Sequence, residues 1–423
     1  MREGKVHPER LEANIGAEYA EVKALWDSCQ VASFDTQVSL YYAEFISYLQ
    51  KNKMSEVRYR NFINAAMWPP MEAVIAASPD PDSFTVVSST PEIASLYRVF
   101  MQIYSVGSGA DASVFREMLL TTFVAYYIRY QHQKHRSQIY TVSPDLEHAL
   151  LHTELRKYPV DMLQLPFPCI YVELPEQFRV YNRITGWHAA EGAYVVSDDA
   201  TQHRSWRIMM TGKPQEGAFE DDDSLFHFTM EMPEGSTVED AIKHTFSKFI
   251  DSPMVEEEVE INGNICKVRR GFESEEQRDH FKNMEDKMVP VFRYIMNVVI
   301  YTMSTDADIT FWNASKEYRR LRDRAMKAQG SKRKKLFSRL NSVDAEPRTL
   351  LGRNLVVDRK KDSVEYGQAT GRGKWAVRTY VAGYWNTYWV GKGRTERRTM
   401  LVKPHWRGPE EAPLTRTERR VAK

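Results

Sequence analysis

The densest group of chemically informative residues lies near the C-terminus, in the run GYWNTYWVGKG from Gly383 to Gly393. This run contains two Tyr and two Trp, and basic residues flank it on both sides. Flat rings beside positive charge suit stacking on bases or peptide side chains, with Lys and Arg contacting phosphates. The same rings also suit the small core of a β-hairpin. Both interpretations are open at this stage.

We predict that this tail is a binding surface for peptide or RNA. Side chains alternate across a strand, so one face of the run can be buried while the other is exposed. Gly391 and Gly393 allow a tight turn into RTERRTMLVKP, which we expect to be the partner strand. The predicted binding residues are Arg378, Tyr384, Trp385, Tyr388, Trp389, Lys392, Arg394, Arg397, Arg398 and Trp406, joined by a basic patch of Lys332, Arg333, Lys334 and Lys335.

Other residues with catalytic or metal-binding chemistry do not form a recognisable centre. His132 and His135 are three apart and His148 and His152 are four apart, but neither pair belongs to an H-E-x-x-H motif. We interpret them as surface or capping histidines. The acidic run Glu220–Asp223 fits a solvated loop better than a cation site.

Standard catalytic motifs are also missing from the sequence. It has no P-loop, no dinucleotide-binding glycine pattern and no G-x-S-x-G elbow. We therefore predict no catalytic residues, no metal site and no cofactor, and hence a binding protein rather than an enzyme.

Length and composition indicate a globular protein of two or three domains. The chain has 423 residues, of which 42% are hydrophobic, and no apolar run approaches the length of a membrane span. Its charged N-terminus lacks the apolar segment of a secretory signal. The three cysteines are far apart, which argues against a disulfide framework and a cysteine zinc site and favours a reducing cytoplasm. Cys169 sits in an apolar run, and we expect it to be buried.

Charge is divided unevenly along the chain. Residues 314–423 hold 29 Lys and Arg against 11 Asp and Glu, whereas residues 1–313 hold 29 against 46. Such asymmetry is typical of a nucleic-acid-binding segment attached to an acidic body. Two halves that complement each other within one fold are the alternative, and the sequence does not decide between them.

The hydrophobic pattern predicts an α+β fold. The first 155 residues have the apolar spacing of helices, so we predict a helical N-terminal region. Four short β-branched and aromatic runs then predict one antiparallel sheet: 169–174, 192–196, 206–212 and 225–232.

Long packed helices and a basic tail complete the predicted fold. The spacing of Ser236 and Glu239 predicts a capping box for one helix. A second helix from about Ser274 to Met303 is apolar in its second half and contains Pro290. Strands at 306–312 and near 349–357 precede a basic, β-containing C-terminal tail. We divide the chain into a helical N-terminal region (1–155), an α+β core (156–313) and a basic aromatic C-terminal region (314–423).

Four stretches resemble, in order, a known protein family. GYWNTYWVGKG followed by RRTMLVKPHW resembles the C-terminal signature of the second type V-A anti-CRISPR family, which is carried by phages, plasmids and prophages. LPFPCIYVEL from Leu165, GSTVEDAI from Gly235 and DADITF from Asp306 are similar to three earlier motifs of that family. The family's tail is usually rich in His, whereas this chain has Tyr380, Tyr384 and Asn386 at those places.

The resemblance implies a function that composition does not. It implies that the protein recognises the nascent N-terminal segment of a type V-A CRISPR effector, or of another target. Loss of the effector's mRNA then blocks its production in the bacterial cytoplasm. The partners implied are the nascent polypeptide, the mRNA or ribosome, and a host nuclease, with no membrane involved.

Two alternatives belong to other functional classes. One is a metal-dependent RNase or toxin that uses scattered carboxylates such as Asp221–Asp223, Asp306 and Asp308. The other is a phage accessory structural protein.

Overall fold

The computed structural model describes most of the chain, and the described part is α+β, which confirms the predicted fold class. The described residues are 16–55, 58, 62, 65–82, 84–96, 112–135, 138–155, 157–182, 186–198, 204–212, 225–250, 255–261, 264–270, 275–313, 324, 332, 335–336, 347–357 and 378–408. They form two compact units. Unit 1 comprises residues 1–134, 180–231 and 247–283, and unit 2 comprises residues 135–179, 232–246 and 284–423. Both units are discontinuous in sequence, and the predicted boundaries near 155 and 313 stay a prediction.

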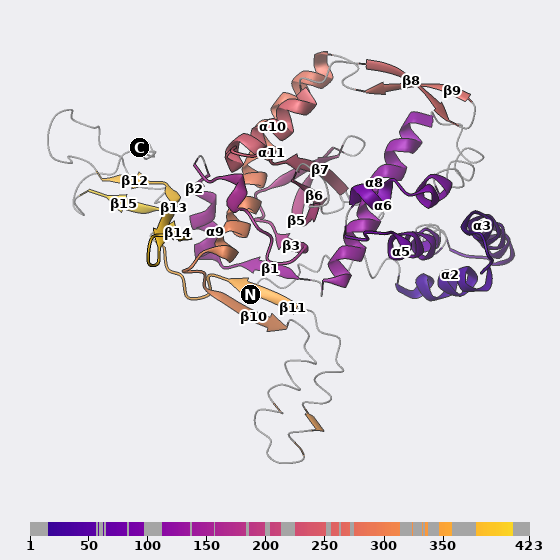
Figure 1. Cartoon of the computed structure of the whole chain (residues 1–423), viewed down its shortest axis with the longest axis horizontal. Helices are drawn as coiled ribbons and strands as arrows, with labels where there is room; N and C mark the ends of the chain where they lie inside the picture. The colour runs from indigo at the N-terminus through magenta and orange to yellow at the C-terminus, as the bar shows by residue number, and fades with distance from the viewer. Residues whose placement is uncertain are drawn as a thin grey trace. The chain divides into compact units, whose positions relative to one another are not determined.

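Unit 1 begins with helices, as predicted for the N-terminal region (Figure 1). They are α2 (Gly16–Ser28), α3 (Phe34–Lys51), α5 (Trp68–Ala77), α6 (Phe84–Ser88) and α8 (Ala112–Lys134). Aromatic rings pack between them: Trp26 of α2 meets Tyr41 of α3 edge-on at 5.3 Å. Trp68 of α5 likewise meets Tyr126 of α8. The many Tyr and Trp of this region therefore serve helix packing.

The strands of unit 1 are antiparallel where their direction is described. They are β4 (Arg179–Asn182), β5 (Gly186–Asp198), β6 (Ser205–Gly212), β7 (Leu225–Glu231), β8 (Val255–Ile261) and β9 (Asn264–Arg270). β5, β6 and β7 lie side by side in that order, and antiparallel pairing joins β6 to both neighbours, as predicted. β8 and β9 form a separate hairpin that the sequence analysis did not predict.

Unit 2 contains a mixed set of strands rather than a purely antiparallel one. β10 (Ile309–Asn313), β11 (Pro347–Leu351), β1 (Ile139–Val142) and β3 (Cys169–Glu173) lie side by side in that order. β1 is parallel to both β11 and β3, and β10 is antiparallel to β11. A parallel pair needs a crossover connection, and α9 (Pro144–Leu151) lies in the connection from β1 to β3. β1 falls within the region that we predicted to be helical.

Two long helices lie mostly in unit 2: α10 (Val238–Ile250) and α11 (Glu275–Met303). Phe246 of α10 packs edge-on against Phe292 of α11 with ring centroids 5.1 Å apart. The second half of α11 is buried from Val291 to Tyr301 except Arg293, which agrees with its apolar sequence, and the helix continues through Pro290. This half of α11 is the centre of the core of unit 2.

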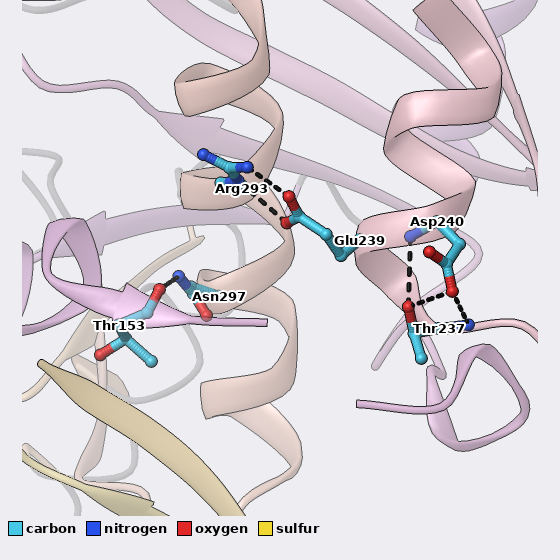
Figure 2. A network of polar contacts seen from close by, with 6 residues as sticks. All are labelled: Thr153, Thr237, Glu239, Asp240, Arg293 and Asn297. Carbon is cyan, nitrogen blue, oxygen red and sulfur yellow. Dashed lines mark hydrogen bonds and ion pairs between the residues drawn. The ribbon is translucent and has the colours of Figure 1, made fainter. Parts of the chain in front are cut away.

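The N-terminus of α10 is capped one residue later than predicted (Figure 2). The Thr237 hydroxyl oxygen accepts a hydrogen bond from the Asp240 backbone N–H, and the Asp240 carboxylate accepts from the Thr237 N–H and hydroxyl. Ser236 instead donates to the Pro233 carbonyl oxygen. The predicted capping box of Ser236 and Glu239 was therefore wrong. Thr237 and Asp240, one residue further along, have the same spacing and form the box instead.

The rest of the described part of unit 2 consists of short elements, including a C-terminal hairpin (yellow in Figure 1). They are β2 (Thr153–Glu154), the 3-10 helix η1 (Val160–Met162), β12 (Thr379–Val381), β13 (Gly383–Val390), β14 (Glu396–Val402) and β15 (His405–Arg407). β13 is antiparallel to β14 and parallel to β2, and β12 pairs with β15. The predicted β-containing tail is therefore confirmed.

Candidate functional site

The aromatic run forms one strand of a hairpin, as the glycines at its end predicted. β13 pairs with β14 from Tyr384 opposite Val402 to Val390 opposite Glu396. Gly391 and Gly393 have φ angles of +85° and +83°, which L side chains rarely adopt, and so permit the turn. The Arg394 N–H closes the turn on the Gly391 carbonyl oxygen at 3.0 Å. The hairpin thus has a root near Gly383 and a tip at 391–398.

A close backbone approach fixes the root. The Gly383 N–H donates to the His152 carbonyl oxygen at 2.8 Å, just before β2. A Cβ atom at Gly383 would lie 2.6 Å from the Thr153 hydroxyl oxygen and 2.9 Å from Pro404. Only glycine fits this position without displacement of its neighbours.

One asparagine of α11 joins the root to the core of unit 2 (Figure 2). The Asn297 side chain is 1% exposed, and its amide nitrogen donates to the carbonyl oxygens of Leu150 and Thr153, both at 3.0 Å. Its amide oxygen accepts from the Trp385 indole N–H at 2.7 Å. One buried side chain thus connects α9, β2 and β13 to α11, and each of these buried polar groups has a partner.

The turn between α11 and β10 holds the second strand of the hairpin. Thr305 donates both its N–H and its hydroxyl to the Thr399 carbonyl oxygen of β14. The Asp306 carboxylate accepts from the Leu401 N–H at 3.5 Å. The Asp308 carboxylate accepts from the Asn354 backbone and side chain. Asp306 and Asp308, the two described aspartates of the RNase alternative, therefore form structural hydrogen bonds here.

The tip is the exposed part of the hairpin. Every residue from Gly391 to Arg398 is exposed, and the Trp389 side chain beside them is 53% exposed. Arg397 lies directly opposite Trp389 in the register, with its guanidinium carbon 5.2 Å from the ring centroid. On the other face Arg398 lies opposite the half-buried Tyr388. The tip and the end of β13 beside it gather six of the predicted binding residues: Tyr388, Trp389, Lys392, Arg394, Arg397 and Arg398.

The charges of the tip are mostly positive. Arg398 binds the two carboxylate oxygens of Glu396 with its Nε and Nη2 atoms, at 3.0 and 3.4 Å. These hydrogen bonds raise the pKa of the Arg398 guanidinium. Arg397 lies near Tyr158; burial raises the pKa of that phenol and the charge of Arg397 opposes the shift. The tip therefore presents a cationic surface around one exposed indole.

The structure places the other predicted tail residues elsewhere. Trp385 is 9% exposed and bonded to Asn297, so it belongs to the core rather than to an exposed surface. Tyr384 is half-buried at the root. Trp406 and Arg378 form a second group with Tyr380: the two rings meet edge-on at 5.1 Å, and the Arg378 guanidinium carbon lies 5.9 Å from the Trp406 ring.

The predicted basic patch is described only in part. Lys332 and Lys335 are exposed residues with helical backbone, while Arg333 and Lys334 lie outside the described residues. The Glu220–Asp223 run, including the carboxylates of the RNase alternative, also lies outside them.

Three of the four paired histidines pack against aromatic rings: His132, His148 and His152. His132 is 3% exposed and meets Tyr194 edge-on, so it is not the surface residue that we expected. In unit 2, the His148 Nε2 atom lies 2.9 Å from the Tyr380 hydroxyl. His152 is the C-cap residue of α9, which agrees with the predicted capping role. Cys169 is fully buried, as expected, and burial raises the pKa of its thiol.

The described residues hold neither a cluster of metal ligands nor a membrane-spanning helix. They contain no group of three or more His, Cys, Asp or Glu side chains placed to hold a metal ion. No helix within the described ranges is long and apolar enough to cross a membrane.

Sequence reasoning missed residues whose partners are distant in the chain. Asn297 was not singled out because it lies in an apolar helix. A lone amide at a buried helical position does, however, indicate an internal hydrogen bond. Arg293 of α11 forms a bidentate ion pair with Glu239 of α10 (Figure 2). The Arg293 Nε atom lies 2.9 Å from a Glu239 carboxylate oxygen. This pair fixes the two long helices relative to each other within unit 2.

A protein-family model identifies the family of this chain. A search of curated proteins finds no match. The chain is similar to the crystal structure of AcrVA2, at 11% sequence identity and a TM-score of 0.39, over 94% of this chain and 95% of that one. The model of the AcrVA2-like family, described as the anti-CRISPR type V subtype A2 family, matches residues 140–408. That range is well over half of the chain and includes all four stretches that carried the resemblance, together with the hairpin and its root. The chain therefore belongs to the anti-CRISPR type V subtype A2 family.

Proposed function

We propose that this protein is a non-enzymatic inhibitor that recognises a nascent polypeptide, that of a type V-A CRISPR effector, and triggers loss of its mRNA. The observation that carries the proposal is the family match over residues 140–408, which agrees with four motifs in the expected order. The partners in this proposal are the nascent N-terminal segment, the message or ribosome, and a host nuclease, all in the bacterial cytoplasm.

The hairpin supports a binding role. It is held by hydrogen bonds to Asn297 and His152, which accept, and from Thr305, which donates, so little ordering entropy is lost when a partner binds the tip. The described aspartates at the adjacent turn, Asp306 and Asp308, accept backbone hydrogen bonds. These features favour an adaptor over a metal-dependent RNase.

The test separates recognition of the peptide from recognition of the message. A type V-A effector gene is expressed with and without this protein in three forms. The first has its native leader codons, the second has synonymous codons, and the third has a compensated frameshift that changes the leader peptide while keeping nearly the same nucleotides. Transcript levels are measured by quantitative PCR, with an unrelated transcript from the same promoter as the control.

We expect the native and synonymous transcripts to fall and the frameshifted transcript to persist. If the frameshifted transcript falls equally, the protein recognises nucleotides rather than the nascent peptide. If none of the three falls, the effector is not its target and the proposal fails for this partner.

A further inference from the structure

The tip of the hairpin carries charge that the fold does not use. Four of the exposed residues in 391–398 are cations, and the single acid, Glu396, is bonded to Arg398. The other three cations form no ion pair within the described part of the chain. These three tip cations are Lys392, Arg394 and Arg397. They are available to the anionic groups of a partner.

An exposed indole lies within this charge. Trp389 is 53% exposed even though Arg397 lies over its ring. A large apolar ring left in solvent gains nothing for the fold, whereas a base stacked on it removes both surfaces from water. Arg397 adds a cation–π contact and a charge at the same place.

The turn keeps an arginine where glycine is easier to accommodate. Arg394 has a φ angle of 54° and is the one residue other than glycine with positive φ among those that the structure describes. Left-handed backbone is unfavourable for an L side chain, and Gly391 and Gly393 avoid this cost in the same turn. Strain of this kind is retained where a side chain has a function.

We propose that the hairpin tip binds single-stranded RNA, with phosphates on the three tip cations and a base stacked on Trp389. Cations that follow a backbone, next to a ring that holds a base, are the combination by which proteins bind single strands without sequence preference. The choice of RNA over DNA rests on the proposed function, in which the protein acts on a message. The nascent peptide then binds elsewhere on the protein.

The test measures binding of the purified full-length protein to a labelled oligouridine of about 20 nucleotides by fluorescence anisotropy. With three phosphate contacts, we expect the affinity to fall about 20-fold between about 50 mM and about 200 mM KCl. Trp389→Ala is expected to weaken binding about tenfold. The double variant K392A/R394A is expected to reduce the salt slope to about a third of its original value.

Two matched controls change exposed residues outside the hairpin. Lys51→Ala combined with Lys53→Ala removes the same charge from exposed positions in unit 1. Phe311→Ala removes an aromatic ring that is 72% exposed on β10. Both controls are expected to leave the affinity and the salt slope unchanged. Trp389→Phe keeps a ring at the tip and is expected to recover most of the binding lost in Trp389→Ala.

Two results would overturn the proposal. One is an RNA affinity that does not change with KCl concentration, or that falls equally in the tip variants and the controls. The other is full displacement of the RNA by a peptide of similar length and negative charge, which would make an acidic protein surface the partner. This experiment does not measure transcript loss. A protein that fails to bind RNA would therefore not contradict nascent-peptide recognition, and transcripts that do not depend on the leader peptide would not contradict the RNA-binding surface.

Discussion

Trp385 and Trp389 lie four residues apart on the same face of β13, yet their surroundings are opposite. Trp385 faces Leu401, is 9% exposed and donates a hydrogen bond to Asn297. Trp389 faces Arg397 and is 53% exposed. The root of the hairpin therefore stabilises unit 2, while the tip supplies a surface.

The two tryptophans differ in exposure because of their positions along β13, and not because they lie on different faces of it. Alternation predicts which side chains share a face, but it does not predict how far along the strand the core extends. In this hairpin the core ends after Thr399, which is 5% exposed, and Arg398 beyond it is exposed. One short sequence of similar residues thus carries both fold and proposed function, and mutation can separate the two.

The largest expected effect is the contrast between the two tryptophans. Trp385→Ala removes a buried ring and leaves the Asn297 amide oxygen without its donor, so we expect the free energy of unfolding to fall by about 3–5 kcal/mol. Trp389→Ala at the exposed tip is expected to change it by less than about 1 kcal/mol. Urea unfolding of both variants measures the contrast. Equal losses would show that the tip also belongs to the core.

The next largest effect is expected when the hydrogen bonds of Asn297 are removed together. Asn297→Ala removes a donor from two buried carbonyl oxygens and the acceptor from the Trp385 indole N–H, so we expect a loss of about 3 kcal/mol. Trp385→Phe removes only the indole donor and is expected to cost less. A double-mutant cycle between these variants should give a coupling energy of about 1 kcal/mol. Strict additivity would mean that the hydrogen bond between the two side chains does not contribute to stability.

A smaller effect is expected at the glycine of the root. In Gly383→Ala the new methyl group would lie against the Thr153 hydroxyl and Pro404, so we expect a loss of about 1–3 kcal/mol from crowding. At the tip, a Cβ on Gly393 would meet nothing closer than 3.8 Å, so Gly393→Ala is expected to cost about 1 kcal/mol through its positive φ alone. Thermal unfolding of both variants distinguishes crowding from backbone strain. A cost at Gly383 no greater than that at Gly393 would contradict the close approach.

The elements that sequence predicted well are those set by local pattern. The apolar second half of α11 and the hairpin glycines Gly391 and Gly393 depend on residues close in the chain, and both predictions were confirmed. The β8–β9 hairpin also had a local signal, because the Asn262–Gly263 dipeptide lies between its strands in the sequence. Its many charged residues concealed that signal.

The elements that sequence could not predict depend on partners far away in the chain. Ser236 with Glu239 and Thr237 with Asp240 both have the spacing of a capping box. What decides between them is Arg293, because it holds Glu239 from another helix. The burial of Trp385 likewise depends on Asn297, 88 residues earlier. Local pattern gives the candidates, and long-range contacts choose among them.

The smallest effect on stability is expected for Arg394→Gly, which best separates the stability of the hairpin from its binding. Arg394→Gly relieves a left-handed backbone strain but adds the conformational freedom of glycine, so we expect the free energy of unfolding to stay unchanged or to rise by up to about 1 kcal/mol. The same change removes one tip cation and is expected to lower the magnitude of the salt slope of RNA binding by about 0.7. Urea unfolding and anisotropy on one protein preparation measure both quantities. A variant that is no less stable and yet binds RNA less well would show that the tip keeps Arg394 for binding, whereas a destabilised variant with unchanged binding would show that the turn needs arginine for its fold.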